Sequence, residues 1–290
     1  MQERRSGRQP RFLALEDEQM TRAGRIVRRI LRIMELPSEQ WRATKRGYET
    51  DFTWPGTTVE TAQQPRANAL REFFESRKQG PGIWKWNHSF DIYDRHFHRF
   101  RGKEVHILEI GVFSGGSLEM WRDYFGPKAV IYGVDIEPDC RAYENNGIKI
   151  FIGDQADRSF WREFRRQVPN LDIVIDDGGH QSEQQIVSVE ELLPILRPGG
   201  VYICEDVLYA WNKFASYVHG LGHRLNDRFP DDERQHVCCT PFQSAVSSIH
   251  LYPFVTVLER SAVPVTEFRA PKHGTQWQPF YNSKPFYDLR

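Results

Sequence analysis

The sequence has no excess of charge of either sign, because lysine plus arginine and aspartate plus glutamate both number 39 in 290 residues. A chain without net charge has no overall field that attracts it to a phosphate backbone, so no nucleic-acid partner is expected. It has no run of 18 apolar residues, so we expect no transmembrane segment. Its first residues are basic and polar and lack the apolar core of a secretory signal, which favours a cytoplasmic protein.

Cysteine is also scarce. The four cysteines are Cys140, Cys204, Cys238 and Cys239, and no two of them form a CxxC pair. Adjacent residues such as Cys238 and Cys239 are awkward for a structural disulfide, so we expect reduced thiols. The stability must then come from a core, for which 39% of hydrophobic residues is enough.

The first 80 residues predict an arm rather than a folded domain. Ile26, Ile30, Ile33 and Met34 recur at helical spacing among arginines, which predicts a basic amphipathic helix. Such a helix can pack on its own domain, on a membrane surface or on a partner, and we expect it to carry a homo-oligomer contact. Residues 47–66 are rich in glycine, proline and threonine and predict a loop. The organised domain is expected over 81–290.

From about residue 105, short apolar runs alternate with helical stretches. The runs are VHILEIG, VIYGVDI, IKIFIGD, LDIVIDD and VYICEDV, and helices are expected over 116–124, 158–167 and 182–196. Near-continuous apolar strands are typical of a parallel sheet buried on both faces. The pattern predicts a doubly wound α/β fold, with a late, antiparallel strand over 254–259.

Polar residues end these strands, where open α/β sheets bind ligands. After the first strand, the turn from Glu109 to Ser117 contains Gly111, Gly115 and Gly116, which let a ligand approach the backbone and the free amides of the next helix. Without a ligand it would be a tight turn. The turn lacks the GxGxxG spacing of nicotinamide-nucleotide sites, which favours a methionine-bearing nucleoside.

The next two strands end in further candidates. Asp135 lies 24 residues after Gly111, where an acid accepts hydrogen bonds from the two ribose hydroxyls of a nucleoside. Asp154 and Gln155 follow the third strand and could bond the exocyclic amine of adenine, although Asp154 could equally cap a helix. Asp176 could cap a helix or hold the amino group of the cofactor.

This arrangement resembles motif I and the following motifs of class I S-adenosylmethionine-dependent methyltransferases, with Glu109 as the leading acid. The resemblance implies a Rossmann-like, mainly parallel seven-stranded sheet and S-adenosylmethionine as cofactor. The residues that we assign to the cofactor are Glu109, Gly111, Gly115, Gly116, Ser117, Asp135, Asp154, Gln155 and Asp176.

Acids also gather after the fourth and fifth strands. Asp177, Glu205 and Asp206 would repel one another unless a cation held them, which predicts a magnesium site. Without a metal they would be helix caps. His180 follows Asp177 on a Gly-Gly turn and is a candidate general base, although a lone histidine is often structural.

This set resembles the magnesium-dependent sugar O-methyltransferases of natural-product biosynthesis, typified by the mycinamicin and rhamnosyl enzymes. The resemblance covers about residues 83–210. It includes four residues before the first strand: Lys85, His88, Tyr93 and Phe97. A second, shorter similarity covers 273–280. The resemblance implies that Asp177, Glu205 and Asp206 are the metal ligands and His180 the base. The larger members carry an auxiliary domain that residues 1–80 are too short to reproduce.

Residues 208–245 are expected to form a lid, whose aromatic residues either stack on the acceptor or pack in the core: Tyr209, Trp211, Phe214, Tyr217 and Phe229. The predicted function is O-methylation of a small-molecule hydroxyl on a sugar or other vicinal diol. The alternatives are a catechol, a phenol or a carboxylic acid as acceptor. A domain that binds S-adenosylmethionine without catalysis is a further alternative.

Overall fold

The computed structural model describes residues 40–51, 67–145, 147–227, 236–271 and 273–275. The chain divides into two units, 1–64 and 65–290, which are considered separately. The predicted helix at 26–34, the ring of Phe229 and residues 276–280 lie outside the described residues, and the oligomer contact stays a prediction. In the first unit residues 40–49 are helical, so Gly47, expected in a loop, belongs to a helix instead.

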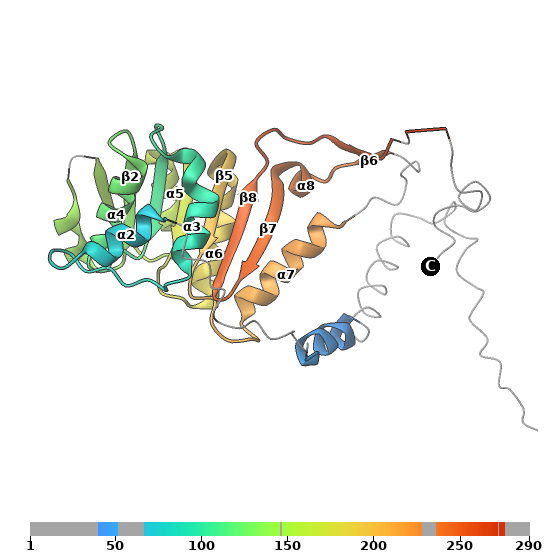
Figure 1. Cartoon of the computed structure of the whole chain (residues 1–290), viewed down its shortest axis with the longest axis horizontal. Coiled ribbons are helices and arrows are strands. Elements are labelled where there is room, and N and C mark those ends of the chain that lie inside the picture. Colours follow the sequence, from blue (N-terminus) through green and yellow to red (C-terminus); the bar gives the residue numbers. More distant parts are fainter. Residues whose placement is uncertain (1–39, 52–66, 146, 228–235, 272, 276–290) are drawn as a thin grey trace, which may run out of the picture. The chain divides into compact units, whose positions relative to one another are not determined.

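The second unit is built on a seven-stranded sheet of order β3-β2-β1-β4-β5-β8-β7 (Figure 1). Strands β1 to β5 are parallel, whereas β8 is antiparallel to both β5 and β7. The five expected strands are all present, and the expected late strand is antiparallel β8. The strands are β1 (His106–Ile110), β2 (Val130–Asp135), β3 (Ile148–Ile152), β4 (Leu171–Asp176), β5 (Leu196–Cys204), β7 (Val246–Tyr252) and β8 (Val255–Arg260).

Helices cover both faces of the sheet. Successive residues of a strand point to opposite faces, and Ile107 and Leu108 of β1 accordingly belong to two separate apolar cores. One face carries α2 (Ala69–Ser76), α3 (Ser89–Phe97) and α4 (Gly116–Phe125), and the other carries α5 (Arg158–Gln167), α6 (Ser182–Leu192) and α7 (Lys213–Leu225). The remaining elements are η3 (His98–Phe100), η4 (Pro138–Tyr143), η5 (Leu193–Ile195), α8 (Pro241–Ala245) and a small sheet of β6 (His236–Cys238) and β9 (Glu267–Arg269).

The helix expected over 182–196 is shorter than predicted. It ends at Leu192, because Pro194 has no amide hydrogen to continue the helical ladder, and a 3-10 turn follows. Strand β5 then begins at Leu196, the last residue of the expected helix, and runs through Pro198.

The packing that supports the second unit begins before residue 81. The side chain of Asn68 caps α2 by accepting hydrogen bonds from the amides of Leu70 (3.0 Å) and Arg71 (3.2 Å). Leu70 is buried in the same core as Tyr93 and Trp121. Among the residues that the structure describes, no helix combines the length and the apolar character that crossing a membrane requires.

Candidate active site

A cavity of about 650 Å³ opens at the carboxyl ends of the parallel strands. Its wall comes from the residues that follow β1 to β5 and from segment 82–86 before α3. Nine of the predicted site residues line it: Gly111, Ser117, Asp135, Asp154, Gln155, Asp177, His180, Glu205 and Asp206. The other four, Glu109, Gly115, Gly116 and Asp176, do not.

The turn after β1 depends on its glycines. Gly111 has a φ of +88°, and a Cβ atom there would lie 2.0 Å from the carbonyl oxygen of Asp177. Any side chain would push apart the turns that follow β1 and β4. Gly115, with a φ of +74°, is the N-cap of α4, so the free amides at the start of this helix follow directly after the turn.

Asp135 holds this turn in place. Its Oδ2 accepts hydrogen bonds from the amides of Val112 (2.8 Å) and Phe113 (3.0 Å), and its Oδ1 accepts one from Glu137 (2.9 Å). Phe113 and Ile136 line the cavity, yet their side chains are 73% and 67% exposed. Two exposed apolar side chains beside a carboxylate suit a ligand that combines a flat ring with hydroxyl groups.

Two acids follow β3, Asp154 and Asp157, and they have different roles. Asp157, not Asp154, caps α5, since its side chain accepts a hydrogen bond from the amide of Ser159 (2.7 Å). Asp154 accepts one from the amide of Ala156 (2.8 Å) and lines the cavity. The capping alternative for Asp154 is therefore wrong for α5.

Gln155 is buried, and its amide group is bonded at both ends within the protein. It donates to Asp176 Oδ1 (3.0 Å) and Ser188 Oγ (3.2 Å), and its Oε1 accepts from the amide of Gly179 (2.7 Å). Both amide hydrogens are used, which leaves one acceptor lone pair for a ligand. Gln155 thus links the turns after β3 and β4.

Asp176 belongs to the same buried network rather than to the cavity wall. The hydroxyl of Tyr202 donates to its Oδ2 (2.8 Å). Burial raises the pKa of Asp176 to about 6, against the hydrogen bonds from Tyr202 and Gln155, which lower it. Asp176 was expected to contact the cofactor directly, but its side chain is 1% exposed, does not line the cavity and is bonded within the protein.

A buried lysine, which the sequence did not single out as a site residue, lies among the predicted acids. The Nζ of Lys85 is 2.6 Å from Asp177 Oδ2, 3.1 Å from Glu205 Oε1 and 3.4 Å from Glu109 Oε1. Glu109 also accepts a hydrogen bond from Ser117 Oγ (2.7 Å), so it connects the lysine to α4. The sequence signals for this lysine were its place in the family resemblance and its position between two tryptophans, Trp84 and Trp86.

These neighbouring charges shift one another's pKa values. Burial lowers the pKa of Lys85, but the carboxylates of Asp177 and Glu205 outweigh it and the pKa lies well above its usual value. Burial and the charge of Asp177 raise the pKa of Glu205 to about 8. Burial likewise raises the pKa of Glu109, although Lys85 and Ser117 oppose this.

The three predicted metal ligands do not converge on one point. A candidate cation group instead consists of Asp177, His180 and Asp206, whose ligand atoms all lie within 4.8 Å of one another. His180 Nε2 is 3.4 Å from Asp206 Oδ2, and its Nδ1 is buried without a hydrogen-bond partner among the described residues. Glu205 is turned toward Lys85.

The backbone at this group is strained, because His180 and Asp206 have φ values of +56° and +51°. Left-handed conformations are uncommon for residues other than glycine and occur often at functional sites. An oxygen-rich group with an unpartnered buried imidazole nitrogen fits a divalent cation with an acceptor beside it. The structure therefore supports Asp177 and Asp206 as ligands, whereas Glu205 lies outside this group and is only 2% exposed beside Lys85.

Aromatic side chains surround this end of the cavity. Trp86 Nε1 donates to Asp206 Oδ1 (2.6 Å), while its ring lies 5.4 Å from that of Phe254. The β7–β8 turn that carries Phe254 is fixed by hydrogen bonds from Val207 N to Phe254 O (2.9 Å) and between His88 and Pro253 O (2.8 Å). Trp84 also lines the cavity and is 85% exposed. These rings form a wall open to solvent.

The aromatic residues of the predicted lid, 208–245, have different surroundings. Phe214 is fully buried in the core beneath α7, as the packing alternative expected. Tyr209 and Trp211, just before α7, are exposed. No described residue of α7 lines the cavity, so closure by this helix stays a prediction.

Comparison with known proteins identifies relatives. No protein-family model matches the chain. The demethylmacrocin O-methyltransferase of Streptomyces fradiae is 39% identical over 158 residues, covering 52% of this chain and 38% of that protein. The L-olivosyl-oleandolide 3-O-methyltransferase of Streptomyces antibioticus is 30% identical over 257 residues, covering 80% of this chain and 63% of that protein. The chain is thus similar in sequence to these two O-methyltransferases.

Solved structures agree with this relationship. The MycE methyltransferase of the mycinamycin biosynthetic pathway, in complex with Mg and SAH, superposes with a TM-score of 0.56 at 29% identity, covering 69% of this chain and 55% of that chain. The same methyltransferase has been solved with Mg, SAH and mycinamycin VI (TM-score 0.55). The expected Rossmann-like methyltransferase fold is thereby confirmed. The chain spans 38% to 63% of the length of the two curated relatives described above.

Proposed function

We propose that this chain is an S-adenosylmethionine-dependent O-methyltransferase that acts on a sugar hydroxyl and uses magnesium. The observation that carries the proposal is the single cavity with two chemically different ends. One end combines the glycine turn with Asp135 and exposed apolar side chains, and the other combines Asp177, His180 and Asp206 with exposed tryptophans. A donor nucleoside and a polar acceptor can therefore lie side by side.

The donor end suits a nucleoside. Asp135 accepts three backbone amides and keeps one acceptor lone pair, on Oδ1, for a ribose hydroxyl, while Phe113 and Ile136 offer apolar surfaces for the adenine. Asp154 also lines the cavity and bonds only the amide of Ala156 among the contacts described above, whereas Glu109, Gln155 and Asp176 support the turns through buried hydrogen bonds. S-adenosylmethionine supplies an activated methyl group when it is bound there.

The acceptor end contains the acids and the base. Asp177 and Asp206 would hold magnesium, which as a Lewis acid lowers the pKa of a bound hydroxyl. His180 lines the cavity with its Nε2 3.4 Å from Asp206 Oδ2, and it is the base that removes the proton of the acceptor hydroxyl. Trp86 donates to Asp206 and offers its ring to the apolar face of a sugar.

The choice of a sugar rests on this wall and on the relatives, which include a mycinamicin VI 2''-O-methyltransferase of Micromonospora griseorubida (41% identical over 157 residues). A catechol would use the same metal and the same rings. A carboxylic acid would need neither His180 nor a metal.

One assay separates these alternatives. The protein is incubated with S-adenosylmethionine carrying a labelled methyl group and with a glycoside, its deoxy analogue, a catechol or a carboxylic acid, in magnesium or in excess chelator. We expect transfer to the glycoside, none to the analogue that lacks the hydroxyl, and loss in chelator. Transfer to the carboxylic acid in chelator would overturn the proposed acceptor. Tight cofactor binding without transfer to any acceptor would favour a non-catalytic domain.

A further inference from the structure

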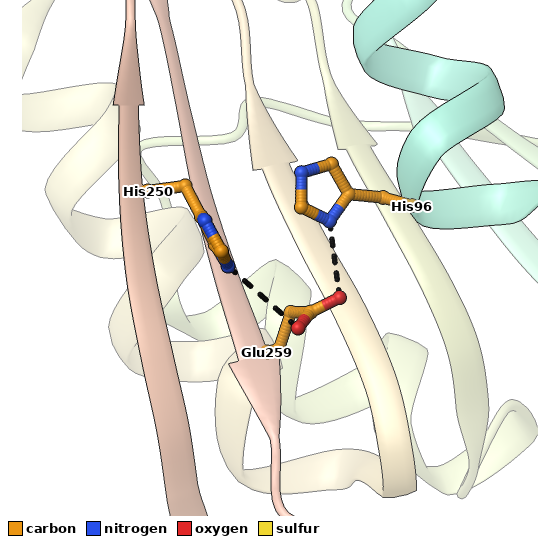
Figure 2. A group of neighbouring side chains, drawn as sticks. All are labelled: His96, His250 and Glu259. Carbon is orange, nitrogen blue, oxygen red and sulfur yellow. Dashed lines mark hydrogen bonds and ion pairs between the residues drawn. The ribbon is translucent and has the colours of Figure 1, made fainter.

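A second group of metal-type ligands lies away from the cavity. Figure 2 shows His96 of α3, His250 of β7 and Glu259 of β8 directed toward one another. None of the three lines the cavity. In the sheet Glu259 pairs with Val201, three residues before Cys204 at the end of β5, which puts it about 10 Å along the strand from the active-site edge.

The spacing of the ligand atoms suits a small tetrahedral cation. His96 Nδ1 is 3.0 Å from Glu259 Oε1, and His250 Nε2 is 3.7 Å from Glu259 Oε2. All three residues have ligand atoms within 4.8 Å of one another. Ligands at roughly 2.0 to 2.1 Å from a tetrahedral zinc ion are about 3.4 Å apart, so the observed pairs bracket the required distance.

Neighbouring groups already orient these ligands. Tyr252 bonds the other ring nitrogen of His96 (3.0 Å), which fixes the ring as outer partners of metal-bound histidines do. Ser248 Oγ lies 3.0 Å from His250 Nε2 and 3.2 Å from Glu259 Oε2, so this hydroxyl holds the two ligand atoms together and must turn away from His250 Nε2 when an ion binds there. The ring centroids of His96 and His250 are 4.8 Å apart.

Arg99 is the one cation that competes for this position among the described residues. Its Nη1 donates to Glu259 Oε1 (3.1 Å), and its Nη2 donates to Gly199 O (3.1 Å). The side chain of Arg99 is 39% exposed, so it can move into solvent. His96, by contrast, is 3% exposed and fixed, while the half-buried His250 leaves a path for an ion.

We propose that His96, His250 and Glu259 form a second cation site, for a divalent transition metal of the zinc class, that joins α3 to the β7–β8 hairpin. Two imidazoles and one carboxylate match zinc, whereas magnesium prefers oxygen ligands only. The two sites thus differ in metal as well as in place. This site is structural and does not depend on the proposed reaction.

The test is a zinc titration of the full chain, stripped of metal, by competition with a chromogenic chelator in millimolar magnesium. His250→Asn should weaken the zinc affinity at least about 10-fold, since losing a ligand costs no less than losing its outer partner. Glu259→Gln should do the same. The matched control is His98→Asn, which changes an exposed histidine on η3 and should bind zinc like the wild type.

Thermal unfolding separates this result from a folding defect. In chelator, His250→Asn should unfold at the wild-type temperature, because the side chain is partly exposed, and added zinc should stabilise only the wild type and His98→Asn. Unchanged zinc affinity in both His250→Asn and Glu259→Gln would overturn the site. So would loss of the zinc in His180→Gln instead, because the ion would then belong to the cavity.

Discussion

Replacing Lys85 with methionine tests the ionic core of the active site. Methionine keeps most of the volume but removes the ammonium group that lies within 3.4 Å of Asp177, Glu205 and Glu109. Glu109 and Glu205 are 0% and 2% exposed and would lose their counter-charge. Removing one partner from a buried ion pair costs about 3 to 5 kcal/mol, or roughly 6 to 20 °C in Tm for a domain of this size.

The effect should depend on pH. The pKa of Glu205 is about 8 in the folded protein and 4.5 ordinarily, so the folded state binds an extra proton between these values and stability falls as the pH rises through this window. Without Lys85 that pKa rises further. The deficit of Lys85→Met should therefore grow above pH 8, by up to about 1.4 kcal/mol for each pH unit.

The assay is thermal or urea unfolding at pH 6, 7.5 and 9 in chelator, with Lys128→Met on the surface as control. A magnesium ion would restore a positive charge beside these carboxylates. In place of chelator, millimolar magnesium should therefore raise the stability of Lys85→Met more than that of the wild type. A Tm of Lys85→Met within 2 °C of the control at every pH, a margin of about 1 kcal/mol at most, would refute the account of Lys85 as a buried counter-ion.

Three further changes probe the two ends of the cavity. Asp135→Ala should weaken S-adenosylmethionine binding by about 2 to 3 kcal/mol in calorimetry, because the ribose and the turn amides lose their acceptor; unchanged affinity would contradict this role. His180→Gln should lower turnover roughly 10² to 10⁴-fold at unchanged cofactor affinity, and near-normal turnover would exclude a general base. Trp86→Ala should raise the KM for a glycoside roughly 10-fold, about 1.4 kcal/mol, while Trp86→Phe should retain most of the affinity; equal effects of the two would assign the role to the bond with Asp206.

The sequence predicted the central sheet well because its strands are buried on both faces. In the run Leu171–Asp176 four of the six residues are apolar and five are buried, a density that is typical of strands covered on both faces. Strand β7 was not predicted, since it lies at the sheet edge and contains Ser247, Ser248 and His250 among half-exposed positions. The apolar spacing predicted a helix as far as residue 196, but Pro194 ends the α-helical hydrogen bonding and α6 is therefore shorter.

The candidate site was predicted as a set of strand ends but not as a set of contacts. Parallel strands bring their carboxyl ends together, so the sequence could place Asp135, Asp177 and Asp206 at one edge. It could not show that Lys85 would reach acids 24, 92 and 120 residues away, because a side-chain contact over such separations depends on the packing of the segment before α3. Gln155 and Asp176 were predicted to contact the cofactor, but they bond each other in a buried network, which likewise depends on side-chain contacts between distant segments.

The most direct test of the central claim is a calorimetric titration of the full chain with S-adenosylmethionine, S-adenosylhomocysteine and NAD. The turn from Gly111 to Ser117 and the acid Asp135 predict one site per chain that binds either S-adenosylmethionine or S-adenosylhomocysteine, with NAD binding far more weakly. Binding of NAD with equal affinity, or no binding of S-adenosylmethionine by the folded protein, would contradict the account.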